Sequence, residues 1–225
     1  MFEDRRDAGQ QLAEALEGYR GEDVSVLAIP RGGVEVGYQV AKQLDADFSL
    51  LIVRKLPYPD QPEAGFGAVA EDGSAVILEQ ASRWVSDETV KQVIENQRQE
   101  IERRVAVLRK GEPLPALEGR TVILVDDGIA MGSTMQSAIM LCRRQGAAKV
   151  VVAVPVASRQ IADQHWPDKV GAERTGIADE MVVLEQPKFF RAVAQVYDRW
   201  YDVPDSEVMA LMERWREEQE EEALA

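Results

Sequence analysis

The chain has 225 residues and a net charge of −14, with 40 acidic against 26 basic side chains. Its length suits one α/β domain whose core needs neither metal nor disulfide support. The negative charge repels phosphate backbones and anionic lipids, which argues against nucleic-acid and membrane partners. A single cysteine, Cys142, excludes an intrachain disulfide and favours a reducing compartment. Since residues 1–9 are mostly polar and the longest apolar run covers only residues 150–157, we expect a cytoplasmic protein without a membrane span.

Short β-branched runs alternate with amphipathic stretches, a pattern typical of parallel strands joined by crossover helices. The predicted strands, apolar enough to be covered on both faces, are residues 24–29, 49–53, 121–125, 150–155 and 180–184. Residues 34–44 and 133–145 show helical spacing of apolar side chains after the first and third strands. The sequence therefore predicts an α/β fold with a Rossmann-like parallel sheet flanked by helices.

Two segments between the second and third strands interrupt this alternation. Residues 56–65 are rich in proline and glycine and predict a long loop, whereas residues 66–78 alternate around a turn and predict a β-hairpin. Residues 86–110 predict a long polar helix that begins at an N-cap, Ser86, and covers the sheet with its apolar side.

The last part of the chain predicts a terminal helix. Asp205 is expected to cap this helix, which runs into an acidic stretch at residues 217–222. The acidic stretch is interpreted as a solvated helix surface and not as a binding segment.

The ends of the first two strands contain candidate anion-binding residues, because open parallel sheets bind ligands beyond the carboxyl ends of their strands. The first strand leads into Arg31, Gly32 and Gly33, where glycine lets backbone N–H groups approach a ligand at a helix N-terminus. The same residues also fit a plain tight turn. The second strand runs into Arg54 and Lys55, which are either cations of a lid over an anionic reaction or a pair of surface cations.

The end of the third strand has the most specific pattern. Two acids, Asp126 and Asp127, precede the loop Gly128, Ile129, Ala130, Met131, Gly132, Ser133 and Thr134. The glycines free the backbone and the hydroxyls begin a predicted helix, so the loop suits a phosphate monoester. It is not a Walker loop, because the lysine of that motif is missing. Since carboxylates accept hydrogen bonds and ligate hard cations, the combination suits a ligand with vicinal hydroxyls and a phosphate, such as ribose 5-phosphate.

The run VILVDDGIAMGSTM, residues 122–135, closely resembles the phosphoribosyl-pyrophosphate (PRPP) signature of type I phosphoribosyltransferases. AIPRGG at residues 28–33 resembles the pyrophosphate loop of that family, and residues 54–73 resemble the flexible loop and hairpin of one bacterial branch. Residues 2–16 also fit that branch. The resemblance implies the type I phosphoribosyltransferase fold over residues 1–225 as a single domain. The implied parts are a core at about 22–185, a hood formed by the N-terminal segment and about 185–204, and a C-terminal helix at 205–222.

The resemblance also implies an activity and residue roles. The activity is magnesium-dependent transfer of the 5-phosphoribosyl group from PRPP to a nitrogenous base, with release of pyrophosphate, in nucleotide salvage; a homodimer is also plausible from the family. Asp126 and Asp127 would hold the ribose 2′- and 3′-hydroxyls and orient Mg²⁺ through water, and the loop from Gly128 to Thr134 would wrap the 5-phosphate. The pyrophosphate would be bound by Arg31, Gly32, Gly33, Arg54 and Lys55. The implied catalytic residues are Asp126, Asp127, Arg31 and Lys55.

Two positions depart from the better-known members of the family. Ala130 replaces the Asp of enzymes that act on 6-oxopurines, which argues against hypoxanthine and guanine as acceptors. Met131 stands where many members have Thr, so one hydrogen-bond donor to the 5-phosphate is lost at a cost of roughly 1 kcal/mol. The aromatic residues of the predicted hood either stack on the acceptor base or merely pack the hood; they are Phe189, Phe190, Tyr197, Trp200 and Tyr201.

Two other functions stay open beside transfer to a base. A PRPP-sensing regulator would keep the same fold, although the basic surface or added domain of a nucleic-acid binder is missing from the sequence. A reverse or phosphorolysis-like reaction on an unusual nucleotide is the other alternative.

Overall fold

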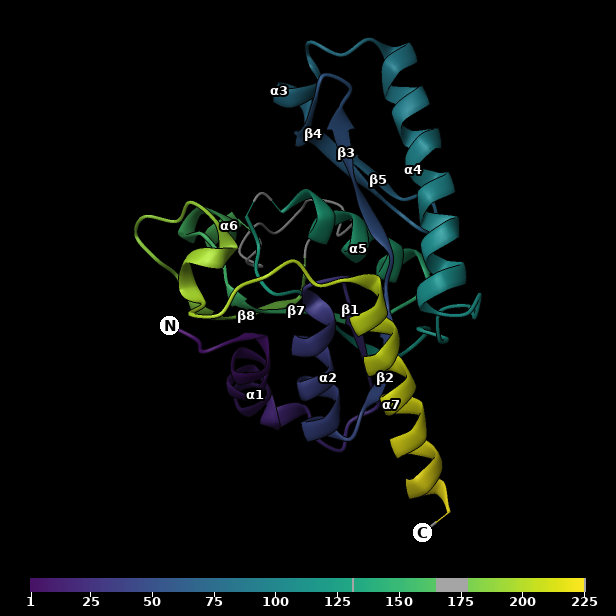
Figure 1. Ribbon diagram of the computed structural model, residues 1–225, viewed down its shortest axis with the longest axis vertical. Coiled ribbons are helices and arrows are strands. Elements are labelled where there is room, and N and C mark those ends of the chain that lie inside the picture. The colour runs from purple at the N-terminus through teal and green to yellow at the C-terminus, as the bar shows by residue number, and fades with distance from the viewer. Residues whose placement is uncertain (131, 165–177, 225) are drawn as a thin grey trace.

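The computed structural model describes residues 1–130, 132–164 and 178–224. It contains a five-stranded parallel sheet in the order β2-β1-β6-β7-β8 and a separate three-stranded antiparallel sheet in the order β3-β4-β5 (Figure 1). The parallel strands are β1 (Val24–Ala28), β2 (Asp47–Leu50), β6 (Thr121–Val125), β7 (Lys149–Val156) and β8 (Glu180–Glu185). The predicted α/β class and its parallel sheet are therefore confirmed.

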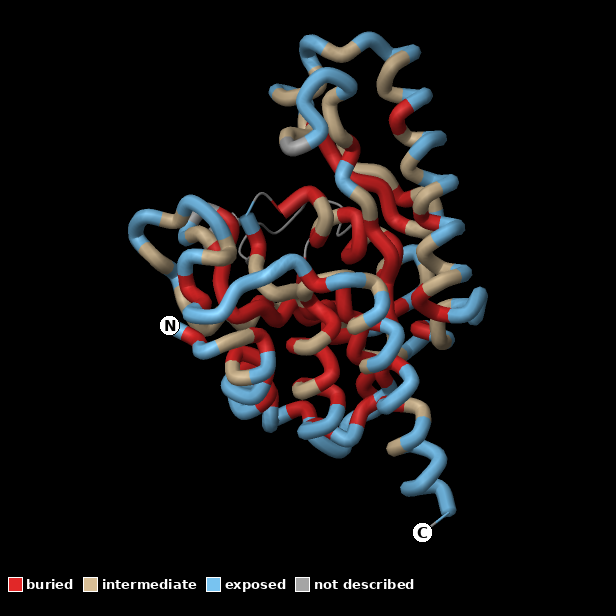
Figure 2. Tube along the Cα trace, viewed as in Figure 1, coloured by how far each residue is buried: buried red, intermediate tan, exposed pale blue. Residues whose placement is uncertain are grey.

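Both faces of the parallel sheet are covered, as the apolar strands predict. Alternate side chains of β1 and β6 point to opposite faces, so Val26 and Ile123 join one buried cluster while Leu27 and Leu124 join another. The first cluster includes helices α1 (Arg5–Ala15), α2 (Gly33–Leu44) and α7 (Asp205–Ala223), and the second includes α5 (Ser133–Arg144). Figure 2 shows the resulting buried layer through the middle of the molecule, whereas the C-terminal part of α7 is exposed.

The antiparallel sheet forms an arm that projects from the parallel sheet in Figure 1. It consists of β3 (Val53–Tyr58), β4 (Gln61–Ala70) and β5 (Ala75–Ile77), followed by the short helix α3 (Glu79–Ser82). The predicted hairpin at residues 66–78 corresponds to β4 and β5.

The predicted loop at residues 56–65 is wrong, because residues 56–58 belong to β3, residues 61–65 belong to β4, and only the two residues between them form a turn. Pro57 lacks an N–H group, but β3 is an edge strand and the pairing shifts register on both sides of Pro57. A proline at a bulge of an edge strand removes no hydrogen bond from the interior of a sheet. The second parallel strand also ends earlier than predicted, at Leu50, so Arg54 lies inside β3 and not at the end of a parallel strand.

The long helix α4 (Asp87–Leu108) begins as predicted. The Ser86 hydroxyl accepts a hydrogen bond from the N–H group of Thr89 at 3.1 Å and so caps the helix. Its buried side packs mainly on β3, β4 and α7, and its buried residues join the hydrophobic cluster on one face of the parallel sheet.

The predicted N-cap of α7 is wrong. Pro204 occupies the N-cap position, and Asp205 is the first helical residue. The Asp205 carboxylate lies 3.7 Å from the Arg31 guanidinium and 3.8 Å from that of Arg103, so it faces two cations instead of the helix N-terminus.

The remaining elements are the short helix α6 (Arg159–Gln164) and two 3₁₀ turns, η1 (Glu17–Tyr19) and η2 (Val193–Val196). Across the described ranges, none of the helices is long and apolar enough to cross a membrane.

Candidate active site

The strand order places the candidate site at one point of the sheet. From β1 the chain winds to β2 on one side, whereas β6, β7 and β8 follow one another on the other side. Such a reversal between adjacent strands opens a crevice at their carboxyl ends, where ligands of α/β proteins bind. Ala28, the last residue of β1, is paired with Val125, the last residue of β6. The two most suggestive sequence motifs therefore begin side by side.

A cavity of about 320 Å³ lies at this crevice. It gathers residues from the β6–α5 loop, the arm and the hood; the lining residues are Lys55, Gly65, Gly67, Asp126, Gly128, Ile129, Ala130, Gly132, Ser133, Thr134, Met135 and Val193. Eight of these lining residues were predicted from the sequence. They are Lys55, Asp126 and the six residues of the loop from Gly128 to Thr134 that the structure describes. The remaining loop position with a predicted role, Met131, lies outside the described residues.

The start of α5 is suited to an anion. Gly132 occupies the N-cap position with φ of 84°, a left-handed conformation that favours glycine, and as a glycine it has no side chain to cap the helix. The first N–H groups of a helix have no partner within the helix and carry its positive dipole. Ser133 and Thr134 place two hydroxyls in the same turn. This geometry agrees with the phosphate cradle expected from the sequence.

Packing of the surrounding side chains requires glycine at position 128. A Cβ atom at this position would lie 2.7 Å from Val156 of β7 and 2.7 Å from Val193 of η2. The loop after β6 is thus held against both the sheet and the segment that contains Val193. The isolated bridge between Ile129 and Ala157 fixes the same loop along β7.

The two acids point to different surroundings. Asp126 lines the cavity, and its Oδ1 accepts a hydrogen bond from the N–H group of Asp127 at 2.8 Å. The Asp127 side chain is only 13% exposed, and its Oδ2 accepts a hydrogen bond from Arg5 Nε at 2.9 Å. Tyr197 donates its hydroxyl to the Asp127 carbonyl at 2.7 Å. The carboxylate of Asp127 is therefore already engaged by the N-terminal segment.

Burial raises the pKa of both carboxyl groups. For Asp126 the effect is large and the adjacent Asp127 carboxylate adds to it. For Asp127 burial is again the main cause, but the Arg5 guanidinium acts in the opposite direction. Two neighbouring acids with raised pKa values in a cleft are typical of functional sites.

The predicted pyrophosphate loop lies directly against Asp127. A Cβ atom at Gly32 would lie 1.8 Å from Asp127 Oδ2, so only glycine fits there. The peptide bond between Pro30 and Arg31 is cis. The N–H groups of Gly33 and Val34 donate to the carbonyls of Ile29 and Arg31 within the loop. The Arg31 side chain faces Asp205 and does not line the cavity.

Arg54 and Lys55 lie on opposite faces of β3, as successive strand residues must. Lys55 lines the cavity opposite the start of α5. Arg54 Nε instead donates to Gln97 of α4 at 3.1 Å, and burial together with the nearby Arg104 lowers its pKa. The structure therefore brings only the second of these two cations to the candidate phosphate site.

The aromatic residues of the hood mainly pack the hood. The ring centroid of Tyr197 lies 5.6 Å from that of Phe2 and 5.2 Å from that of Trp200. Backbone hydrogen bonds also join Phe2 to Val196 and to Asp198. Phe189 is 85% exposed. Of the two interpretations given by the sequence, packing accounts for Tyr197 and Trp200.

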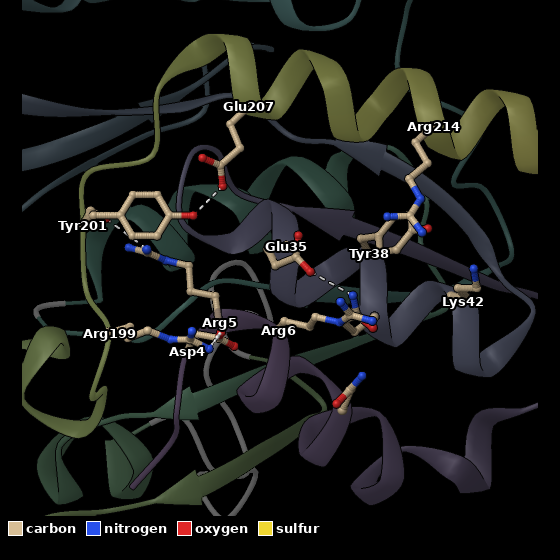
Figure 3. A pocket seen from close by; sticks show the side chains of 12 residues that line it. Asp4, Arg5, Arg6, Glu35, Tyr38, Lys42, Arg199, Tyr201, Glu207 and Arg214 are labelled. Carbon is tan, nitrogen blue, oxygen red and sulfur yellow. Dashed lines mark hydrogen bonds and ion pairs between the residues drawn. The ribbon is translucent and has the colours of Figure 1, made fainter.

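A second, more open cavity of about 630 Å³ lies between α1, α2, α7 and the hood (Figure 3). Figure 3 shows Arg5 reaching toward Tyr201, whose hydroxyl donates to Glu207 at 2.6 Å. The cavity is lined by both cationic and acidic side chains, and two of them, Arg199 and Asp4, form an ion pair at 2.6 Å. Its mixed charge gives no clear preference for an anion.

The described residues contain no group of three or more acidic, histidine or cysteine side chains that would hold a metal ion alone. Mg²⁺ usually keeps several waters and is held by one or two carboxylates together with substrate phosphates. Asp126 and Asp127 fit this smaller requirement and do not form a complete protein cage.

Comparison with known proteins decides the family. The model of the phosphoribosyl transferase domain matches residues 5–185. The chain belongs to the phosphoribosyltransferase family. Proteins from two strains of Mycobacterium tuberculosis, provisionally named phosphoribosyl transferases, are 42% identical over 216 residues, which are 95% of this chain and 47% of theirs. The chain thus spans about half the length of these relatives.

A solved structure shares the fold over nearly the whole chain. The protein TT1426 from Thermus thermophilus is 37% identical and superposes with a TM-score of 0.75 over 96% of this chain and 99% of that one. The family model and the curated relatives confirm the phosphoribosyltransferase resemblance noted from the sequence.

Sequence reasoning missed several residues of this candidate site. Gly65 and Gly67 of β4 line the cavity because the arm folds over it, and Val193 reaches it from the hood. Arg5 contacts Asp127 across 122 positions of sequence. One signal for Arg5 was present, since it lies on the buried side of α1 with Ala8 and Leu12 at helical spacing. A charged residue on such a face requires a buried partner.

Proposed function

We propose that this chain transfers the 5-phosphoribosyl group of PRPP to the nitrogen of a base, with release of pyrophosphate. The observation that supports this most is the cavity in which Lys55 and Asp126 lie beside the uncapped start of α5. A neutral phosphate cradle, an acid and a separate cation match the three parts of PRPP: the 5-phosphate, the sugar hydroxyls and the pyrophosphate.

In this reaction the bond between ribose C1 and a pyrophosphate oxygen breaks, and a bond between C1 and the base nitrogen forms. The base loses a proton from that nitrogen, and the pyrophosphate leaves with the electron pair of the broken bond. Positive charge develops on the ribose ring, next to the acids Asp126 and Asp127. Negative charge develops on the leaving group, where Lys55 would stabilise it. The other proposed pyrophosphate ligands are Arg31, Gly32, Gly33 and Arg54.

We also propose dependence on Mg²⁺. When bound, Mg²⁺ would neutralise charge on the pyrophosphate and so favour its departure. Asp126, which faces the cavity, and Asp127 would hold the ion through water. Two carboxylates beside a phosphate-bearing substrate are a suitable donor set for this ion.

For the acceptor we propose a base other than a 6-oxopurine. Ala130 is exposed and lines the cavity, and its methyl group cannot exchange a proton with a purine. Near the end of β7 the Ser158 hydroxyl accepts a hydrogen bond from Ile161 N–H at 3.2 Å, so it acts as a helix cap and is less suited to a base.

We propose small-molecule partners only, with no nucleic acid or membrane partner, because the net charge of −14 gives no electrostatic attraction to either. We also propose a cytoplasmic location, which is supported by the single free cysteine, Cys142. A homodimer is a further proposal, and it rests on the family alone.

A panel assay tests the proposed reaction. The chain is incubated with PRPP, Mg²⁺ and single purine or pyrimidine bases, and pyrophosphate is measured. We expect release with at least one base other than hypoxanthine or guanine, and loss of that release in Asp127→Asn with the fold retained. PRPP binding without pyrophosphate release for any base would favour the PRPP-sensing regulator.

A further inference from the structure

Arg5 belongs to the N-terminal segment but reaches into the acid pair. It is the first residue of α1, directly after Asp4, whose side chain accepts a hydrogen bond from Asp7 N–H and caps the helix. The residue is 7% exposed, which is rare for arginine unless its charge is paired. The residues that contact the Arg5 guanidinium must therefore compensate a buried positive charge.

Contacts with Asp127, Tyr201 and Trp200 fix the Arg5 guanidinium. Nε donates to Asp127 Oδ2 at 2.9 Å, and Nη1 donates to the Tyr201 carbonyl at 3.0 Å. The guanidinium also stacks over the Trp200 ring at 3.9 Å from its centroid, an arrangement that is favourable for a cation. Two of these contacts come from the hood, so the hood holds the guanidinium in place against Asp127.

The oxygen that Arg5 contacts is also the one that packs against the pyrophosphate loop. Asp127 Oδ2 would lie 1.8 Å from a Cβ atom at Gly32, so the carboxylate fills the space that this glycine leaves. Arg5 and Gly32 thus restrict the Asp127 side chain at a single oxygen. Oδ1 of Asp127 would lie 3.0 Å from the same Cβ atom, and the Asp126 carboxyl group lies beside the Asp127 side chain. Tyr197 holds the backbone of the same residue through its carbonyl.

We propose that Arg5 is a positioning residue, which holds the Asp127 carboxylate in the orientation that binds the sugar hydroxyls of PRPP and so links the hood to the sugar site. This inference rests on the proposed function. Removing the hydrogen-bonding partner of a metal-binding residue typically lowers metal affinity or activity by about 10- to 100-fold, and we expect a loss of similar size in PRPP affinity when Arg5 no longer holds Asp127.

Anchoring of the N-terminal segment is the alternative role, and Arg199 provides a matched control for it. Arg199 binds the same segment through Glu3 and Asp4 at 2.7 and 2.6 Å but does not contact Asp127. Its side chain is 64% exposed, so its ion pairs contribute little.

The experiment compares PRPP binding in the presence of Mg²⁺, measured by calorimetry, for the unsubstituted chain, Arg5→Gln, Arg5→Lys and Arg199→Gln. We expect about a 10-fold or greater loss of affinity in Arg5→Gln and at most about a twofold loss in Arg199→Gln. Arg5→Lys should fall between them, because lysine keeps the charge but cannot hold Asp127 and the Tyr201 carbonyl with a rigid fork. A thermal melt of each variant verifies folding, and Arg5→Lys against Arg199→Gln remains decisive if Arg5→Gln does not fold.

Equal losses in Arg5→Gln and Arg199→Gln would overturn the positioning role and leave an anchoring role. Unchanged affinity in Arg5→Gln would overturn it as well. Both results presuppose that the unsubstituted chain binds PRPP; if it does not, the proposed function fails, and the role of Arg5 fails with it.

Discussion

Gly32→Ala tests the packing between the predicted pyrophosphate loop and the sugar site. The added Cβ atom would lie 1.8 Å from Asp127 Oδ2, whereas real Cβ atoms essentially never approach a neighbour closer than 3.0 Å. The carboxylate must therefore move by at least about 1.2 Å if the backbone stays in place, since Gly32 is the N-cap of α2 and Asp127 follows β6 in a packed part of the molecule. Such a movement would stretch the 2.9 Å bond to Arg5 beyond hydrogen-bonding distance.

The expected effect is on ligand binding. A misplacement of about 1 Å in a substrate-positioning group lowers function by on the order of 100-fold, and we expect PRPP affinity to fall by that factor. Calorimetric titration with PRPP and Mg²⁺ measures it. Gly18→Ala is the control, because a Cβ atom at Gly18 meets no atom within 4 Å. If Gly32→Ala bound PRPP within about threefold of the unsubstituted chain, the proposed contact between the loop and Asp127 would have no role in binding.

Three further predictions concern stability and reactivity. Arg109→Met should lower the free energy of unfolding, measured by urea titration, by about 3 to 5 kcal/mol. The Arg109 guanidinium now binds both carboxylate oxygens of Glu71, at 2.8 and 2.7 Å, and the substitution would leave this carboxylate buried without its partner. A loss below about 1 kcal/mol would contradict this reasoning. The Arg103 and Arg104 guanidinium groups lower the pKa of Glu100 from 4.5 to about 2. Glu100→Gln should therefore cost about 1 kcal/mol near neutral pH, and this difference should shrink as the pH falls from 4.5 toward 2. A difference that stays constant over this pH range would contradict the prediction. Burial raises the pKa of the Cys142 thiol to about 12. A thiol reagent at about pH 8 should therefore label Cys142 only when the chain unfolds. Rapid labelling of the folded chain would disprove the burial of this thiol.

The parallel sheet was predictable because its strands are buried on both faces and read as continuous apolar runs. Val24 to Ala28 and Thr121 to Val125 match the predicted strands within one residue. The arm was harder to predict, because proline in the region of Pro57 usually indicates a loop. Only the position of β3 at a sheet edge makes this proline compatible with a strand, and strand order is a property of the tertiary structure.

The candidate site divides in the same way. Residues from Asp126 to Thr134 are contiguous, so their motif and the helix that follows could be predicted from local sequence. The directions of Arg31 and Arg54 could not, because each side chain is drawn to a partner distant in sequence, Asp205 or Gln97. Arg5 was missed for the same reason.

The central claim is that the cavity beside α5 binds PRPP, and calorimetric titration of the unsubstituted chain with PRPP, with and without Mg²⁺, tests it most directly. We predict saturable binding that is tighter with Mg²⁺, since Asp126 and Asp127 lie where the ion would bridge the protein and the pyrophosphate. No binding at PRPP concentrations on the order of 1 mM under either condition would contradict the claim, because a site of this kind should bind its substrate at or below that level.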